Sequence, residues 1–294
     1  MAFNIKGSVV ALGTPFHEDG TVNFEKLGEL LDWHVEKGTD GIVVLGTTGE
    51  SATMTHEEDA AVVRFALERV AGRVPVIAGS GSNCTETMLE KSIDYDKMGV
   101  DGLLLITPYY NKANARGMIR HFTEVADAVS CPCILYNVPG RTGCSLPLSA
   151  IPELAAHPNI VGIKEASGDI SYAAKLAKYL SDDFVMYSGN DDMIVPMMSL
   201  GAVGVISVFA NVCPAECHAL TDAFLSGDLQ TARRLQLEWL DLINDLFIEV
   251  NPIPVKAALN LMGWNVGGYR LPLCEMDEGN LAVLRAEMGR KGLL

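Results

Sequence analysis

The sequence predicts a closed (β/α)₈ barrel of the TIM type, an α/β fold, followed by a C-terminal helical extension. Short apolar runs rich in β-branched residues recur at regular intervals along the chain. Continuous apolar strands bounded by turn residues are typical of a parallel sheet that is buried on both faces. Eight runs fit this pattern: Ser8–Phe16, Gly41–Glu50, Pro75–Gly81, Gly102–Tyr110, Pro132–Pro139, Ile160–Ser167, Phe184–Asp191 and Gly204–Asn211.

Segments with helical periodicity follow these runs, as at Asn23–Lys37, His56–Ala71, Thr85–Met98 and Ala115–Val129. Eight successive βα units favour closure into a barrel. The competing interpretation is a doubly wound open sheet, which usually carries a glycine-rich phosphate turn after its first strand. That turn reads GTPFHEDG in this chain and does not match.

The domain organisation follows from where the eighth unit ends, near Leu225. We expect a barrel over residues 1–225 and a helical extension over residues 226–294 that packs on the barrel. Helices are predicted at Leu229–Val250, Ile253–Met262 and Asp277–Met288, and no Ser- or Pro-rich linker precedes them. Barrels of this type often occupy about 250 residues, so the 294-residue chain suits one barrel with an extension.

Composition narrows the classes of partner. The net charge of −15 argues against nucleic acid and anionic membrane surfaces, which both require clustered Lys and Arg. The N-terminal residues MAFNIKGSVVALGTPF lack the pattern of an export signal, and no apolar run approaches the length of a membrane span. The seven scattered cysteines, Cys131 and Cys133 among them, are interpreted as reduced structural thiols. We therefore expect a cytoplasmic protein.

Chemistry in such barrels lies at the carboxyl ends of the strands, and one predicted strand carries a lysine there. An inward-facing lysine is costly unless it is paired or neutral, and burial lowers its pKa toward the free amine that attacks a carbonyl. The alternative is a structural ion pair between Lys164 and a carboxylate. Alternation places Gly162, Lys164 and Ala166 on one face and Val161, Ile163 and Glu165 on the other.

Three further strand ends carry polar groups. The segment Gly46–Ser51 (GTTGES) combines two glycines with hydroxyls, which suits a carboxylate, although an ordinary turn with a helix cap has the same composition. Tyr136 can relay protons, and Arg141 can bind a substrate carboxylate through two hydrogen bonds. A packed tyrosine and a surface arginine are the alternatives. Gly189 would let a ligand approach the backbone closely.

Metal and nucleotide cofactors are not expected. The six histidines show neither HxH nor HExxH spacing, which disfavours a metal-dependent aldolase. The segment Gly79–Gly81 lacks the third glycine of a dinucleotide fingerprint.

The segments GTTGES, TPYYN, YNVPGRTG, GIKEASGD, SGNDD and NPIPVK, in this order and spacing, resemble the dihydrodipicolinate (4-hydroxy-tetrahydrodipicolinate) synthases. This family belongs to the Schiff-base aldolases that include N-acetylneuraminate lyase, and the resemblance covers essentially the whole chain. It implies condensation of pyruvate with L-aspartate 4-semialdehyde to 4-hydroxy-tetrahydrodipicolinate, the first committed step toward diaminopimelate and lysine. It also implies a cytoplasmic homotetramer built as a dimer of dimers.

The resemblance further implies the catalytic roles. Lys164 forms the imine with pyruvate. Tyr136 and Thr47 belong to a proton relay that Tyr110 completes, and in this family that tyrosine reaches in from the neighbouring subunit.

Substrate-binding roles follow in the same way. Thr48 holds the pyruvate carboxylate, Arg141 binds the carboxylate of aspartate semialdehyde, and Gly189 and Ile206 line the pocket. Sugar-acid lyases of the superfamily, the main alternative function, generally lack an arginine at the position of Arg141. A non-catalytic binding barrel is the alternative of another class, because fold does not determine function.

Some members of the family bind lysine at the dimer interface. Ser51, Ala52, His56, Asn83 and Tyr109 match that pattern. Asp59 and Thr87 stand where inhibited members often carry His and Glu, and the missing Glu removes a partner for the α-ammonium group of lysine. We therefore expect weak or absent inhibition by lysine.

Overall fold

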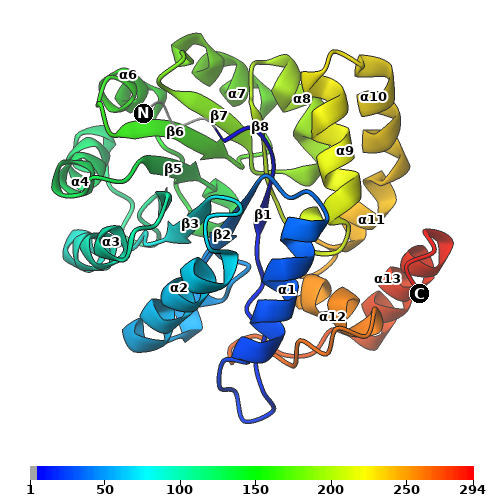
Figure 1. The fold of residues 1–294 in the computed structure, drawn as a ribbon. Coiled ribbons are helices and arrows are strands. Elements are labelled where there is room, and N and C mark those ends of the chain that lie inside the picture. The colour runs from blue at the N-terminus through cyan, green and yellow to red at the C-terminus, as the bar shows by residue number, and fades with distance from the viewer. Residues whose placement is uncertain (1–4) are drawn as a thin grey trace.

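The computed structural model describes residues 5–294, in which eight parallel strands close into one barrel in the order β1 to β8 (Figure 1). The first strand pairs with both β2 and β8, which closes the sheet and confirms the predicted fold class. The strands are β1 Gly7–Ala11, β2 Gly41–Val44, β3 Val76–Gly79, β4 Gly102–Ile106, β5 Cys133–Asn137, β6 Ile160–Glu165, β7 Val185–Ser188 and β8 Gly204–Ser207.

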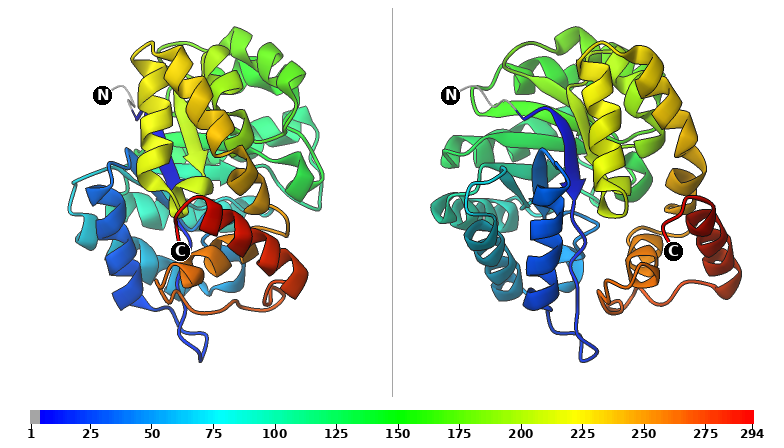
Figure 2. Two further views of the ribbon diagram at one scale, coloured as in Figure 1. Left: turned by 90° about the vertical axis from the view of Figure 1, so that its right-hand side faces the viewer. Right: turned by 45° about the vertical axis from the view of Figure 1, so that its right-hand side comes forward.

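Helices surround the barrel and continue beyond it. Those up to the end of the eighth unit are α1 Phe24–Glu36, α2 His56–Val70, α3 Thr85–Met98, α4 Ala115–Ala128, α5 Pro139–Thr142, α6 Ile151–Ala155, α7 Ile170–Leu176, α8 Ile194–Ser199 and α9 Pro214–Leu225. The helices that follow are α10 Leu229–Glu238, α11 Leu240–Asp245, α12 Ile253–Leu261 and α13 Glu278–Arg290. Figure 2 shows α12 and α13 at the end of the barrel toward which β1 points. Within residues 5–294, no helix is long and apolar enough to cross a membrane.

Helix ends follow local sequence signals. Thr55 caps α2 by accepting a hydrogen bond from the Glu58 amide, while the Glu58 side chain accepts one from the Thr55 amide. The same helix ends at Ala71 in the left-handed region, and α3 ends at Gly99, whose φ of 88° suits glycine. The sequence predicts the ends of α2 and α3 closely because residues next to these ends in the sequence form the caps.

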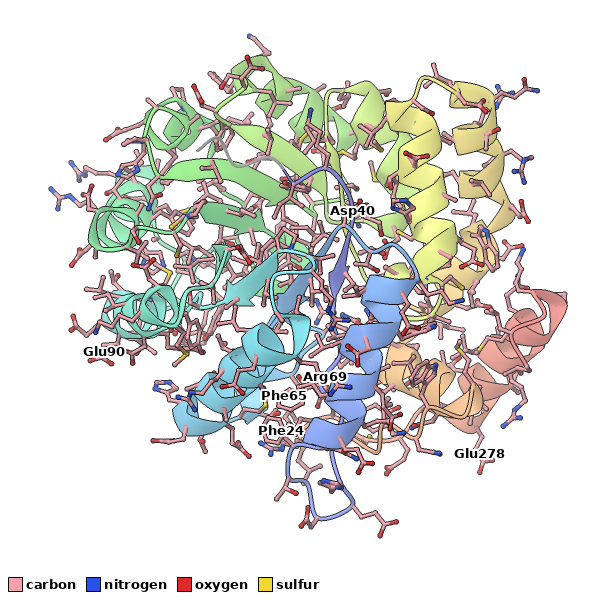
Figure 3. All side chains as sticks on the ribbon, in the orientation of Figure 1. Phe24, Asp40, Phe65, Arg69, Glu90 and Glu278 are labelled. Atoms are coloured by element: carbon pink, nitrogen blue, oxygen red, sulfur yellow. The ribbon has the colours of Figure 1, made fainter. Side chains whose placement is uncertain are left out.

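Two apolar layers bury the two faces of each strand. The inner layer fills the barrel and contains Val9, Val43, Ile77, Leu104, Ile134, Tyr136, Tyr187 and Ile206. The outer layer lies between strands and helices and continues between the helices, where the Phe24 and Phe65 rings of α1 and α2 pack with centroids 5.2 Å apart (Figure 3). Burial on both faces explains why the strands read as continuous apolar runs.

The observed strands end earlier than the predicted runs. The run predicted over Gly41–Glu50 leaves the barrel after Val44, and the run predicted over Gly102–Tyr110 leaves it after Ile106. Left-handed residues lie in both continuations: φ is 58° at Leu45, 55° at Glu50 and 70° at Tyr110. These conformations are incompatible with a strand, so the predicted carboxyl ends are loops.

The alternation predicted for the sixth strand is correct from Ile163 onward and wrong at Val161. Val161 packs against the inner layer, whereas Ile163 belongs to the outer one. The register between β5 and β6 shifts at this point, where Cys133 pairs with Ile160 and Ile134 with Gly162. The extra residue of this bulge turns Val161 inward.

The helix predicted over Leu229–Val250 is wrong as one element. It divides into α10 and α11 at Trp239, whose ring packs on Phe209 with centroids 5.7 Å apart. Before the bend α10 packs against α9, and after it α11 packs against α13.

Barrel closure leads to a stability prediction at Gly204. A Cβ at this position would overlap the backbone oxygen of Gly7 on the paired strand and lie 2.6 Å from its nitrogen. We expect Gly204→Ala to lower the free energy of unfolding by about 1 to 3 kcal/mol, because neither backbone atom can move without disturbing the β1–β8 pairing. Urea denaturation measures this. Gly289→Ala is the matched control, since a Cβ there meets nothing within 4 Å. Equal stabilities for the two variants would contradict the prediction.

Candidate active site

Lys164 lies near the carboxyl end of β6 and faces the barrel interior, where 5% of the residue is exposed. In the strand register it stands level with Tyr136 on β5 and Tyr187 on β7. Its Nζ lies 4.5 Å from the centroid of the Tyr136 ring. Within residues 5–294 it forms no ion pair, so the structural ion pair considered from the sequence is absent from this part of the chain.

The surroundings of Lys164 favour its neutral form. Burial lowers the pKa of the Lys164 ammonium to about 8, the charge of Asp191 acts against this, and the charge of Arg141 adds to it. Burial also raises the pKa of Tyr136, which the charge of Arg141 and the side chain of Thr47 partly offset. The two groups therefore form a buried amine beside a neutral phenol.

Asp191, to which the sequence analysis gives no role, is a buried carboxylate whose charge raises the pKa of Lys164, while burial raises the pKa of Asp191 itself. One carboxylate oxygen accepts hydrogen bonds from the backbone amides of Val208 and Phe209, both at 2.9 Å. Its other oxygen is buried and has no hydrogen-bond partner among residues 5–294. The Gln236 amide donates to the backbone oxygen of Asp191 at 2.9 Å. The SGNDD motif includes this residue, but nothing local distinguishes it from the exposed Asp192.

Tyr136 also lines a cavity of about 460 Å³, whereas Lys164 and Asp191 are not among its lining residues; the lining falls into two groups by the elements that carry it, which we call two arms. One arm is lined by Thr47, Tyr136, Arg141 and Thr142, which come from the carboxyl ends of β2 and β5. The other arm runs between α2 and α3. It is lined by Ser51, Ala52, His56, Asp59, Thr87, Lys91 and Tyr109.

Thr48 and Arg141 meet at Asn251, a residue that the sequence reasoning quoted only within the NPIPVK motif. The Asn251 side-chain amide donates to the buried Thr48 hydroxyl at 2.9 Å. Arg141 donates to the Asn251 backbone oxygen at 3.1 Å. No spacing in the sequence could predict this contact, because Thr48 and Asn251 are 203 residues apart.

Gly189 lies next to Lys164, and Ile206 lies in the inner apolar layer. A Cβ at Gly189 would stand 3.0 Å from Cε of Lys164 and 2.5 Å from the Ala166 Cβ, so only glycine fits there. Ile206 is buried in the inner apolar layer and pairs with Val9 in register.

Tyr110 is not brought to the site within one chain. The residue is 89% exposed, has a φ of 70°, and is absent from the cavity lining. Its backbone amide donates to the Thr142 oxygen at 3.3 Å, which fixes the loop while leaving the phenol outside.

The arm between α2 and α3 contains a cation supplied by the chain itself. The Lys91 ammonium lies 2.7 Å from the buried Asp59 carboxylate, which also accepts a hydrogen bond from Ser51 at 3.1 Å. His56 and Tyr109 line this arm, whereas Asn83 is not part of the lining. Asn83 instead presents its backbone oxygen to the side chain of Asn111 at 2.8 Å.

The fold and site together define a barrel enzyme with a buried lysine at the carboxyl ends of its strands. The model of the dihydrodipicolinate synthetase family matches residues 4–289, and the chain belongs to this family.

Named relatives agree with this assignment. A 4-hydroxy-tetrahydrodipicolinate synthase of Thermoanaerobacter sp. (strain X514) is 54% identical over 290 residues, which cover 98% of this chain and 97% of that protein. The dihydrodipicolinate synthase structure from Aquifex aeolicus superposes with a TM-score of 0.95 at 44% identity, covering 98% of each chain. The chloride inhibited enzyme from Acinetobacter baumannii, solved in complex with pyruvate, has a TM-score of 0.96 at 42% identity and covers 99% of this chain and 100% of its own.

The environment of Lys164 makes a testable electrostatic prediction. Competitive labelling of lysines with acetic anhydride, read by mass spectrometry, should give Lys164 a midpoint of about 8. Asp191→Asn should lower this midpoint, because it removes the buried negative charge that favours the ammonium. Asp192→Asn, at the exposed neighbouring carboxylate, should leave it unchanged. A Lys164 midpoint near 10 in the unmodified protein would show that burial has no such effect.

Proposed function

We propose that this protein condenses pyruvate with L-aspartate 4-semialdehyde through an imine on Lys164, giving 4-hydroxy-tetrahydrodipicolinate. The observation that carries the proposal is the buried Lys164, which has no ion-pair partner within residues 5–294 and lies beside Tyr136, a residue that lines a cavity together with Thr47 and Arg141. The relatives named synthases support the same reaction.

The amine begins the reaction. At neutral pH about one-tenth of a lysine with a pKa of about 8 is neutral and able to attack. Its nitrogen adds to the keto carbon of pyruvate, the oxygen leaves as water, and a protonated imine forms. This imine withdraws electrons from the methyl group, so loss of a methyl proton gives an enamine. The enamine carbon then attacks the aldehyde of the second substrate, forming the new carbon–carbon bond.

Proton transfer accompanies each of these steps. Tyr136 is beside the amine and keeps its proton at neutral pH, because burial raises its pKa. It can therefore donate to the departing oxygen and recover a proton later. Thr47 adjoins Tyr136 and continues the relay, which Tyr110 of a neighbouring subunit completes.

Two side chains would hold the substrate carboxylates. Thr48 receives the pyruvate carboxylate, with its hydroxyl hydrogen available because its oxygen already accepts from Asn251. Arg141 at the cavity wall binds the carboxylate of aspartate semialdehyde. The arginine favours the synthase over a sugar-acid lyase, because the sugar-acid lyases of the superfamily generally lack an arginine at this position.

The assembly and location follow from the family. We propose a cytoplasmic homotetramer, a dimer of dimers, in which Tyr110 crosses an interface, with residues 226–294 forming an extension on a barrel of residues 1–225. The covalent imine supplies the electron sink, so the proposed reaction calls for no metal or nucleotide.

Trapping and a substrate panel test the proposal. The protein is incubated with pyruvate, reduced with borohydride, and digested for mass spectrometry. We expect the pyruvate adduct on Lys164, and turnover with aspartate semialdehyde but not with N-acetylneuraminate or 2-keto-3-deoxygluconate. Absence of the adduct would overturn the imine, and preferential cleavage of a sugar acid would overturn the synthase assignment.

Replacing Tyr110 by Phe separates the two halves of the chemistry. The variant should lose about a hundredfold in kcat, because it loses one member of the proton relay, yet still form the pyruvate adduct on Lys164. Steady-state kinetics and borohydride trapping measure the two effects. Tyr179→Phe, at another exposed tyrosine, is the control. Complete loss of the adduct in Tyr110→Phe would give this residue a different role.

Lysine should inhibit weakly or not at all. Asp59, which stands in the arm between α2 and α3, is already paired with Lys91, and Thr87 offers no carboxylate to the α-ammonium group. A coupled assay with added lysine and calorimetric titration of the free enzyme both measure this. A sub-millimolar inhibition constant would contradict the prediction.

A further inference from the structure

Two contacts join the C-terminal extension to the loop that follows β2. Asn251 precedes α12 and donates from its side chain to the Thr48 hydroxyl at 2.9 Å. Lys256, within α12, places its ammonium 2.8 Å from the Glu50 carboxylate. The two contacts thus join Thr48 and Glu50 of the loop to Asn251 and Lys256 at the start of α12.

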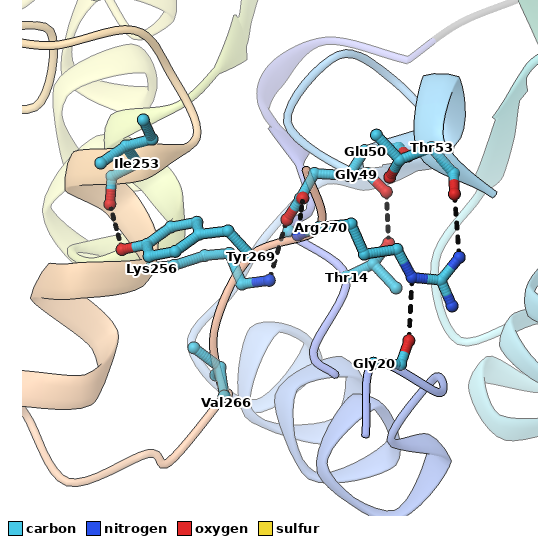
Figure 4. A network of polar contacts seen from close by, with 12 residues as sticks. Thr14, Gly20, Gly49, Glu50, Thr53, Ile253, Lys256, Val266, Tyr269 and Arg270 are labelled. Atoms are coloured by element: carbon cyan, nitrogen blue, oxygen red, sulfur yellow. Dashed lines mark hydrogen bonds and ion pairs between the residues drawn. The ribbon is translucent and has the colours of Figure 1, made fainter. Parts of the chain in front are cut away.

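The Lys256–Glu50 ion pair is fully enclosed. The two side chains are 1% and 0% exposed. The ammonium also lies 4.2 Å from the centroid of the Phe16 ring. Figure 4 shows Lys256 with Glu50 and with Tyr269, whose ring centroid is 5.4 Å from the ammonium. The second oxygen of Glu50 accepts a weak hydrogen bond from the Arg270 backbone amide at 3.4 Å.

Stability alone gives little reason for such a pair. Removing two charges from water costs about as much as their attraction returns, and apolar side chains of similar size often serve as well. Glu50 also has a φ of 55°, a conformation that a residue with a side chain rarely adopts. The pair therefore holds an unfavourable loop conformation in place, and that loop carries Thr47 and Thr48.

Asn251 connects this clamp to both carboxylate-binding side chains. Its amide group holds Thr48, and its backbone oxygen accepts from Arg141 at 3.1 Å. The amide oxygen of Asn251 is buried and has no hydrogen-bond partner in the described part of the chain, so the orientation of the residue depends on its other contacts. The nearest side-chain anchor between its segment and the β2 loop is the Lys256–Glu50 pair.

We propose that Lys256 and Glu50 are positioning residues that act through Asn251 to hold Thr48 and Arg141 at the separation of the two substrate carboxylates. The inference rests on the proposed function, because that function makes Thr48 and Arg141 the carboxylate ligands. Neither Lys256 nor Glu50 touches substrate in this scheme. Their effect appears in substrate affinity rather than in the chemistry at Lys164.

The main test replaces both charges together. In the Glu50→Gln/Lys256→Met double variant, neither buried charge is left without its partner, so the barrel is expected to fold. We expect the KM values for pyruvate and for aspartate semialdehyde each to rise about fivefold to tenfold, as for the loss of one hydrogen bond. We expect kcat to change less than twofold and the pyruvate adduct to form fully at saturation. Unchanged KM values in the folded variant would overturn the proposal.

A second variant tests the route through Asn251 and serves if the double variant does not fold. Asn251→Ala leaves the ion pair intact and should raise the same two KM values. Combined with the charge replacements, it should add little further, because residues that act through one contact are not additive. Unchanged KM values in Asn251→Ala, or full additivity in the triple variant, would overturn the proposal.

Glu287→Gln is the matched control. Glu287 is a buried carboxylate of α13 in the same extension, but its partners Arg290 and Lys291 lie only three and four residues later along the chain. Its replacement should lower the melting temperature without raising either KM. Trapping in the unmodified protein separates the two proposals. If the adduct forms and turnover is normal, but the variants have unchanged KM values, only the positioning role is overturned. If no adduct forms, the proposed function itself is overturned.

Discussion

The burial of one amine organises much of this molecule. Lys164 occupies the barrel interior, and no carboxylate of residues 5–294 pairs with it. A Cβ at Gly189 would stand 3.0 Å from the Cε of Lys164, so glycine leaves room for the side chain, and the Lys164 Nζ lies 4.5 Å from the centroid of the Tyr136 ring. Asp191 supplies a compensating charge but is itself engaged by two backbone amides. The amine is therefore neutralised more readily than an exposed lysine.

The fold could be predicted from the sequence because its signals are local. Burial on both faces gives continuous apolar strands, and caps such as Thr55 with Glu58 define helix ends. The predictions were wrong where a local conformation depends on contact with a residue distant in the sequence. The bulge at Val161 depends on pairing with β5, and the bend at Trp239 depends on packing against Phe209.

The site, too, could be predicted only in part from the sequence. Lys164, Tyr136, Thr47 and Arg141 could be singled out because each lies near or just after the carboxyl end of a strand, and these ends face the same opening. The contacts that support them could not, since Asp191 lies beside Lys164 only through β7 and Asn251 meets Thr48 from the far end of the chain. The place of Tyr110 outside its own cavity is likewise a property of the folded loop, where its φ is positive.

The contact between Thr48 and Asn251 has a consequence for synthesis. The bond spans 203 residues, and the neighbouring Glu50–Lys256 pair spans 206. When all eight strands have emerged from the ribosome, Asn251 and Lys256, which bind the β2 loop, have not yet emerged. Contacts this distant carry a large loop-closure cost and form late. In the proposed scheme, Lys164 is therefore synthesised before Asn251 and Lys256, the residues that hold the β2 loop.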